Sequence, residues 1–250
     1  MKKNLIIFIL LVVSTNSFAA SQKSELAEKY KALNSITNKA SLQRGAKYYV
    51  NYCSGCHSLK YMRMNTLAND LGIDQGIFSK NLIFANKKIG ETMTIPMKEE
   101  DAIQWFGALP PDLSLTARSK GADYIYAKLN TYYEDDNSAT GYNNIAYPNT
   151  SMPHILADLQ GGQKLVVDSK NNPVSFSKTS EGSFSDDEYR KLTNDITNFL
   201  VYVSEPAKLK RQSIGFWVLM FLFIFTILAY YTKKEFWKDV LIHRIKICIL

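Results

Sequence analysis

The stretch Cys53-Ser54-Gly55-Cys56-His57 decides what this chain folds around. Its two thiols stand three positions apart on one turn of helix, so both can add to the vinyl groups of a single haem. The imidazole of His57 follows directly and is placed beneath the iron. The motif therefore predicts one covalently attached haem c, with His57 as an axial ligand.

A pair of cysteines at this spacing also permits other interpretations. Outside the cytosol, Cys53 and Cys56 could form a structural disulfide or a thioredoxin-like redox pair. Neither interpretation gives a role to His57, and no βαβ pattern surrounds the motif. Haem attachment accounts for all three residues.

The haem iron needs a sixth ligand or an open site, and a Met/His pair suits electron transfer. The candidate methionines between the haem motif and the C-terminal apolar segment are Met62, Met64, Met93, Met97 and Met152. Met62 and Met64 follow His57 too closely to reach the opposite haem face. Met152 stands in a loop stiffened by a proline on each side, where it is either the ligand or a methionine packed on the core. His154 is a rival ligand, with a solvent-facing or hydrogen-bonded histidine as the alternative.

The formal net charge of +7 does not indicate a nucleic-acid-binding face, because the excess lies at the two ends. Residues 21–213 carry 23 Lys and Arg against 21 Asp and Glu. The remaining positive charge sits at Lys2 and Lys3 and in the tail after Tyr231. This distribution is typical of membrane orientation.

The N-terminus has the pattern of a secretory signal. Lys2 and Lys3 precede the apolar run Leu5–Val13, and Ser17-Phe18-Ala19 offers small residues at the cleavage site. We predict cleavage after Ala19. The alternative, an uncleaved anchor helix, is disfavoured because the apolar run is too short to span a bilayer.

A second apolar segment, Ile214–Tyr231, is long enough to cross a membrane. It has no charged residue, and as a helix it would measure about 27 Å. A buried core helix is the alternative. Export of the preceding residues leaves the tail in the cytoplasm. We predict a signal peptide at 1–19, a periplasmic haem domain at 20–205, a basic linker at 206–213, a transmembrane helix at 214–231 and a cytoplasmic tail at 232–250.

The soluble part is expected to be all-α, a cytochrome c-like haem domain with long loops and a small β-hairpin. Helices are predicted over Ser41–Tyr52, Ala122–Tyr133 and the stretch that follows the capping box Ser185–Glu188. Gly45 inside the first helix indicates close approach of another helix. The hairpin is predicted to pair Leu165–Val167 with Val174–Phe176.

Several segments together resemble the cytochrome c1 family, over about residues 40–240. They are Arg44-Gly45, Tyr52–Leu59, Asn69–Gly72, Trp105–Leu115, Arg118, Gly121–Tyr126, Gly141–Asn144 and Ser151–His154, followed by the terminal apolar segment. The haem motif is common to all c-type cytochromes, whereas the Pro-Pro-Asp-Leu-Ser segment, the Met-Pro loop and the terminal anchor single out this family. Asn143-Asn144-Ile145 stands where some members carry Asn-Pro-Tyr.

The resemblance implies roles for specific residues. It implies that Met152 is the sixth iron ligand and that Pro110 and Pro111 pack on the haem. A basic residue after this segment would meet a haem propionate, and Arg118 and Lys120 are both candidates.

The resemblance also implies a place in respiration. The chain would be the electron-transfer subunit of a quinol:cytochrome c oxidoreductase in a bacterial inner membrane, without catalysing bond chemistry itself. A Rieske iron–sulfur protein would be its donor, a cytochrome c its acceptor and a cytochrome b subunit its neighbour in a dimeric complex. The acidic run Glu134-Asp135-Asp136 is either a docking site for a basic partner or a solvated loop.

Two alternative functions keep the haem. A free-standing anchored cytochrome c or an oxidase haem subunit would lack the b-type partner. A haem sensor or peroxidase would have an open sixth position. A purely structural domain with a disulfide would have no haem at all.

Overall fold

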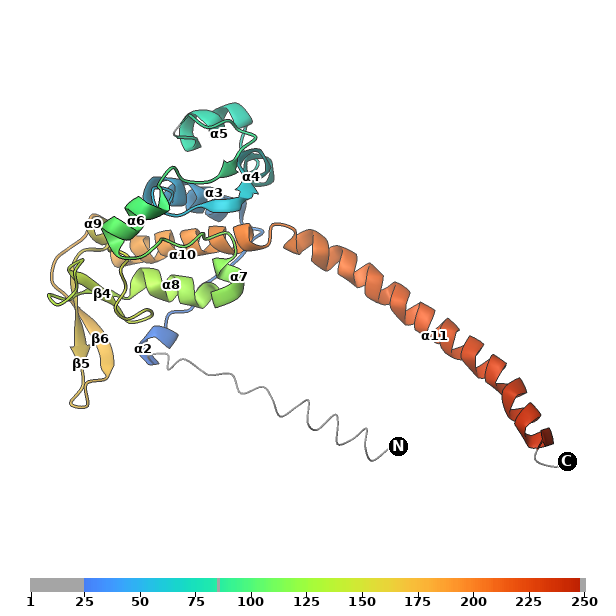
Figure 1. Cartoon of the computed structure of the whole chain (residues 1–250). Helices are drawn as coiled ribbons and strands as arrows, with labels where there is room; N and C mark the ends of the chain where they lie inside the picture. The colour runs from blue at the N-terminus through green and yellow to red at the C-terminus, as the bar shows by residue number, and fades with distance from the viewer. Residues whose placement is uncertain (1–24, 85, 248–250) are drawn as a thin grey trace. The chain divides into compact units, whose positions relative to one another are not determined.

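The computed structural model describes residues 25–84 and 86–247. They form two units, with the division between Ser204 and Glu205. The predicted signal peptide, residues 1–19, lies outside the described residues, and so does the end of the predicted tail. The first unit contains the haem motif and is built around helices α3 (Lys39–Tyr48) and α10 (Asp186–Ser204) (Figure 1).

Helix α3 delivers the haem motif to the core. The side chain of Asn38 caps it by accepting a hydrogen bond from the backbone N–H of Ser41. Its last turn widens into a short π-helix, η1 (Tyr49–Cys53), and the chain then turns so that the N–H of His57 reaches the carbonyl of Cys53. The predicted helix over Ser41–Tyr52 is confirmed in place, with the π turn as an unpredicted feature. Such turns are common at functional sites.

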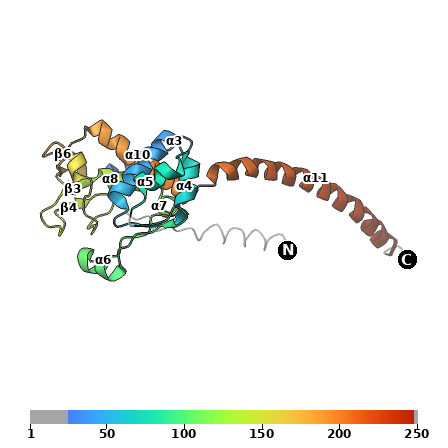
Figure 2. The ribbon, with the colours of Figure 1, turned by 90° about the horizontal axis from the view of Figure 1, so that it is seen from above.

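Helix α10 begins as the sequence predicts. The backbone N–H of Ser185 donates to the Glu188 carboxylate at 2.9 Å, and the Glu188 N–H donates to the Ser185 hydroxyl at 3.4 Å, which is the reciprocal capping box. The helix packs along α3, as Figures 1 and 2 both show. Buried apolar side chains from both helices form the core there, and the rings of Tyr49 and Phe199 lie 5.5 Å apart.

Gly45 permits this close packing. A Cβ added there would lie 2.2 Å from the carbonyl oxygen of Asp195 and 2.6 Å from the Cβ of Phe199. The expected close approach of another helix is therefore confirmed, and the partner is α10. The same crossing buries the Asp195 carboxylate, which accepts hydrogen bonds from Arg44 at 2.6 and 2.9 Å and from the Ser41 hydroxyl at 2.6 Å.

The other helices surround this pair. They are α2 (Glu25–Glu28), α4 (Met64–Leu71), α5 (Gln75–Leu82), α6 (Glu99–Phe106), α7 (Thr116–Lys120), α8 (Ala122–Asn130) and α9 (Ala157–Gln160). In Figure 2, α6 is set apart from α3, α8 and α10. The prediction for α8 was wrong at its end, because the chain leaves the helix at Thr131 and becomes extended rather than continuing to Tyr133.

Three small antiparallel ladders complete the described part of this unit. The predicted hairpin is confirmed as β5 (Gln163–Val167) paired with β6 (Pro173–Lys178). Two ladders were not predicted, and they pair β1 (Leu59–Arg63) with β2 (Thr92–Met93) and β3 (Tyr132–Glu134) with β4 (Tyr142–Asn144). The expected helical class therefore holds for most of the unit, with more strand than an all-α description allows.

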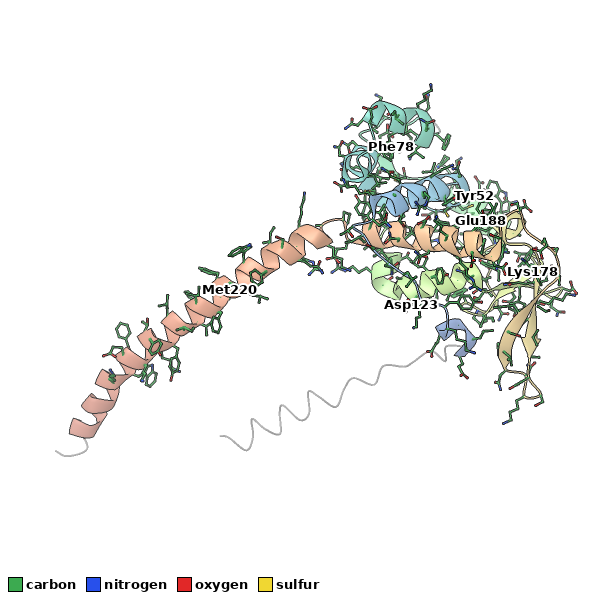
Figure 3. All side chains as sticks on the ribbon, turned by 180° about the vertical axis from the view of Figure 1, so that it is seen from behind. Tyr52, Phe78, Asp123, Lys178, Glu188 and Met220 are labelled. Atoms are coloured by element: carbon green, nitrogen blue, oxygen red, sulfur yellow. The ribbon has the colours of Figure 1, made fainter. Side chains whose placement is uncertain are left out.

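The second unit contains helix α11 (Lys208–Ile247). Within it, Lys210–Lys238 is long and apolar enough to cross a membrane, with a mean hydropathy of 2.2, and it includes the segment predicted from sequence. Met220 lies part-way along the helix, among side chains that project outward around it (Figure 3). Exposed apolar side chains suit contact with lipid.

The α3–α10 crossing yields a stability prediction. Gly45→Ala should lower the free energy of unfolding by about 3 kcal/mol, because the added methyl group meets backbone that cannot move without displacing α10. Thermal unfolding of the detergent-solubilised protein measures this change. Gly90→Ala is the matched control, since nothing lies within 4 Å of a Cβ at that position. Equal unfolding temperatures for the two variants would contradict the close approach.

Candidate functional site

Both thiols of the haem motif face one cavity. Cys53 is buried and Cys56 is half-buried, and both are free cysteines that line the cavity wall. Burial raises the pKa of the Cys53 thiol to about 12 and also raises the pKa of Cys56. The thiols are thus held as neutral groups on an apolar wall, side by side with His57.

The ring of His57 is fixed by a backbone carbonyl. Its Nδ1 lies 2.7 Å from the carbonyl oxygen of Pro111. A carbonyl oxygen only accepts, so Nδ1 carries the proton and the lone pair is left on Nε2. Metal-bound histidines are oriented in this way in proteins generally. Burial lowers the pKa of His57, which favours the neutral ring that a metal requires.

Asp112 holds the segment that orients His57. One of its carboxylate oxygens accepts from the Lys60 N–H at 2.9 Å, and the other accepts from the Ser114 N–H at 2.9 Å. The Leu113 N–H also donates to the Ser58 carbonyl at 2.9 Å. These bonds tie the Pro-Pro-Asp segment to the chain just after the haem motif. The sequence interpretation assigned no role to Asp112, although an Asp two positions before Ser is a common turn signal.

The cavity has a volume of about 660 Å³. Its wall is largely apolar and comes from the haem motif, the Pro-Pro segment, α8, the Met152 loop and α10. The apolar lining residues include Leu109, Pro110, Pro111, Leu113, Leu115, Ile125, Leu129, Pro153, Ile155, Ile196 and Leu200. A cavity of this size and polarity, with two thiols and an oriented imidazole on its wall, fits a flat apolar macrocycle such as haem.

Met152 lies on the same wall. Of the methionines between residues 25 and 205, it is the one that lines the cavity, whereas Met62, Met64 and Met93 are buried in the core. Two hydrogen bonds hold its backbone, because the Met152 N–H donates to the Thr150 hydroxyl at 3.3 Å and the Tyr132 hydroxyl donates to the Met152 carbonyl at 3.3 Å. The side chain is half-buried.

His154, the rival ligand, is buried outside the cavity lining. Its ring stacks on Tyr132 with the centroids 4.5 Å apart and meets the edge of Tyr142 at 5.2 Å. Burial lowers the pKa of His154 to about 4. The solvent-facing alternative is therefore wrong, and the ring is held by aromatic packing.

The two candidate propionate partners differ in position. Both are exposed side chains on α7, but Lys120 lines the cavity and Arg118 does not. A third cation, Lys128 on α8, also lines the cavity and is half-buried. The sequence interpretation missed Lys128, although it follows Tyr124 by four positions and Ile125 by three, and both of these line the same wall.

Two members of the acidic run are engaged within the fold. The Glu134 carboxylate accepts from the Thr179 hydroxyl at 2.8 Å. Asp135 accepts from the side chains of Asn143 and Asn137, and these bonds lower its pKa. The geometry favours a structural turn over a docking site.

Comparisons with known proteins find a matching family model and several relatives. The protein-family model described as "Cytochrome C1 family" matches residues 29–240 of the chain. A cytochrome c1 from Allochromatium vinosum is 44% identical and aligns with 95% of this chain and 99% of its own length. A protein named ammonia monooxygenase gamma subunit, from Nitrosomonas europaea, is 37% identical over 93% of this chain and 97% of its own length. A cytochrome b/c1 from Bradyrhizobium diazoefficiens is 25% identical over 81% of this chain and 34% of its own length.

Proposed function

The chain belongs to the cytochrome c1 family, and on that premise we propose that it relays single electrons from a Rieske iron–sulfur protein to a cytochrome c within a quinol:cytochrome c oxidoreductase. The observation that carries the proposal is the single cavity wall shared by Cys53, Cys56, His57 and Met152. Family membership makes the chain a haem-containing electron-transport protein.

Each residue of the wall has a distinct role. Cys53 and Cys56 would hold one haem covalently, and His57 and Met152 would ligate its iron. Pro110 and Pro111 would pack against the haem, which is supported by their place on the apolar wall. Of the two exposed cations, Lys120 is the better candidate for a propionate contact because it lines the cavity.

The bound haem supplies an iron that changes oxidation state by one electron. The protein performs no bond chemistry in this step. The Pro111 carbonyl keeps the proton of His57 on Nδ1, so Nε2 is available to the iron. The hydroxyls of Thr150 and Tyr132 hold the Met152 loop, and the apolar side chains exclude water.

The candidate membrane helix determines the topology of the chain and the subunit expected beside it. The candidate spanning helix within the described residues and the family membership both support a single-pass membrane protein. We propose that residues 1–19 are a cleaved signal, that the haem domain over 20–205 lies in the periplasm and that the tail over 232–250 lies in the cytoplasm, with residues 206–213 as the basic linker. A cytochrome b beside the helix is supported by the relative whose name joins cytochromes b and c1. The complex is proposed to be a dimer.

Met152→Ala tests the sixth ligand. The variant should lose the spectrum of a six-coordinate haem, bind CO readily when reduced and have a lower reduction potential, because a Met/His pair raises the potential. Absorption spectra of the reduced protein with and without CO measure the change. Met97→Ala is the control, since Met97 is half-buried and does not line the cavity. A wild type that binds CO as readily as Met152→Ala would instead favour a sensor or peroxidase.

The proposed complex is tested by gentle purification of the tagged protein from its native membranes. Its spectrum is recorded after reduction with ascorbate and then with dithionite. A c-type band with ascorbate, joined by b-type bands with dithionite, is the expected result. As a control, the membranes are crosslinked before extraction. A c-type band alone, with no b-type haem even after crosslinking, would contradict the complex and favour a free-standing cytochrome. Oxidation of ammonia by the purified complex would point to the role named in the second relative.

A further inference from the structure

Lys128 places a positive charge on the wall of the haem cavity. It lies in the last turn of α8, and its half-buried side chain lines the cavity together with His57 and Met152. Within the described part of the chain, no carboxylate forms an ion pair with its ammonium. A half-buried cation loses hydration, and no negative charge of the described chain offsets that loss.

The side chain is held where it is. Its ammonium donates to the Thr150 hydroxyl at 3.1 Å and lies 4.6 Å from the ring centroid of Tyr147 and 5.9 Å from that of Tyr132. Asn144 joins the backbone of Lys128 to that of Tyr147. Its side-chain NH2 group donates to the Lys128 carbonyl at 2.8 Å, and its side-chain oxygen accepts from the Tyr147 N–H at 3.0 Å. Both the side chain and the backbone of Lys128 are therefore held in place at the cavity wall.

The environment of the ammonium favours an anionic ligand. Burial lowers the pKa of Lys128 to about 8, and no anion of the described chain compensates for it. An ammonium has three donors, of which Thr150 takes one. The remaining donors fit a carboxylate, since charge-assisted hydrogen bonds of this kind are about twice as strong as neutral ones. Haem carries two carboxylates, in its propionates, into a cavity that is otherwise largely apolar.

We propose that the Lys128 ammonium binds a haem carboxylate and raises the reduction potential of the haem. This inference rests on the proposed function, because it requires the haem. A fixed positive charge beside the cofactor disfavours the oxidised iron, which carries one more positive charge than the reduced iron. The charge acts strongly because Lys128 is half-buried, whereas Arg118 and Lys120 are exposed and screened by water and salt.

The test compares Lys128→Gln with Lys128→Arg in the full-length protein in its native membranes. Gln removes the charge and keeps an amide donor for Thr150, whereas Arg keeps the charge. The readout is an optical redox titration of the c-type band. Lys60→Gln is the matched control, because Lys60 is exposed, also lies over a tyrosine ring (5.2 Å from the centroid of Tyr61) and does not line the cavity.

Lys128→Gln should shift the ratio of reduced to oxidised haem about tenfold toward the oxidised form at a fixed ambient potential, which is about 59 mV for one electron. Lys128→Arg and Lys60→Gln should stay within about threefold of the wild type. A Lys128→Gln ratio equal to that of Lys60→Gln would overturn the inference. Loss of the band from Lys128→Gln alone would support it, whereas loss from Lys128→Arg as well would contradict it, because a retained charge would then not suffice. A wild type without a c-type band would overturn the proposed function itself.

Discussion

The hydrogen bond between His57 Nδ1 and the Pro111 carbonyl is the constraint on which the site depends. It joins two segments more than fifty residues apart and decides which ring nitrogen is left for a metal. Each of the two segments is also held by other hydrogen bonds. The Tyr49 hydroxyl donates to the His57 carbonyl, and the Asp112 carboxylate accepts hydrogen bonds from two backbone N–H groups. The ring of His57 is therefore oriented by contacts within the fold.

The same fold links stability to the site. Gly45 lets α10 lie against α3, so α3 can carry Cys53 to the cavity while α10 contributes Ile196 and Leu200 to its wall. The ion pair between Arg44 and Asp195 satisfies a carboxylate that the crossing buries. The core and the cavity wall are therefore built on the same pair of helices.

Local chemistry explains why parts of this structure could be predicted. The haem motif, the capping box at Ser185 and the β5–β6 hairpin depend on residues that are neighbours in the sequence. The end of α8 could not be predicted, because Tyr132 is drawn into a ladder with Asn144, a pairing that local propensity does not reveal. Asp195 and Lys128 were missed for the same reason. Each is a charged residue whose burial depends on partners far along the chain.

The central claim, that one haem is covalently bound through Cys53 and Cys56, is tested most directly by mass spectrometry. The mature protein is purified from membranes, denatured and digested with trypsin, which releases residues 48–60 as one peptide. The claim predicts that this peptide carries the mass of one haem and that neither thiol reacts with an alkylating reagent. A peptide without haem whose thiols are both alkylated would contradict it. So would a peptide that is two hydrogen atoms lighter because of a disulfide.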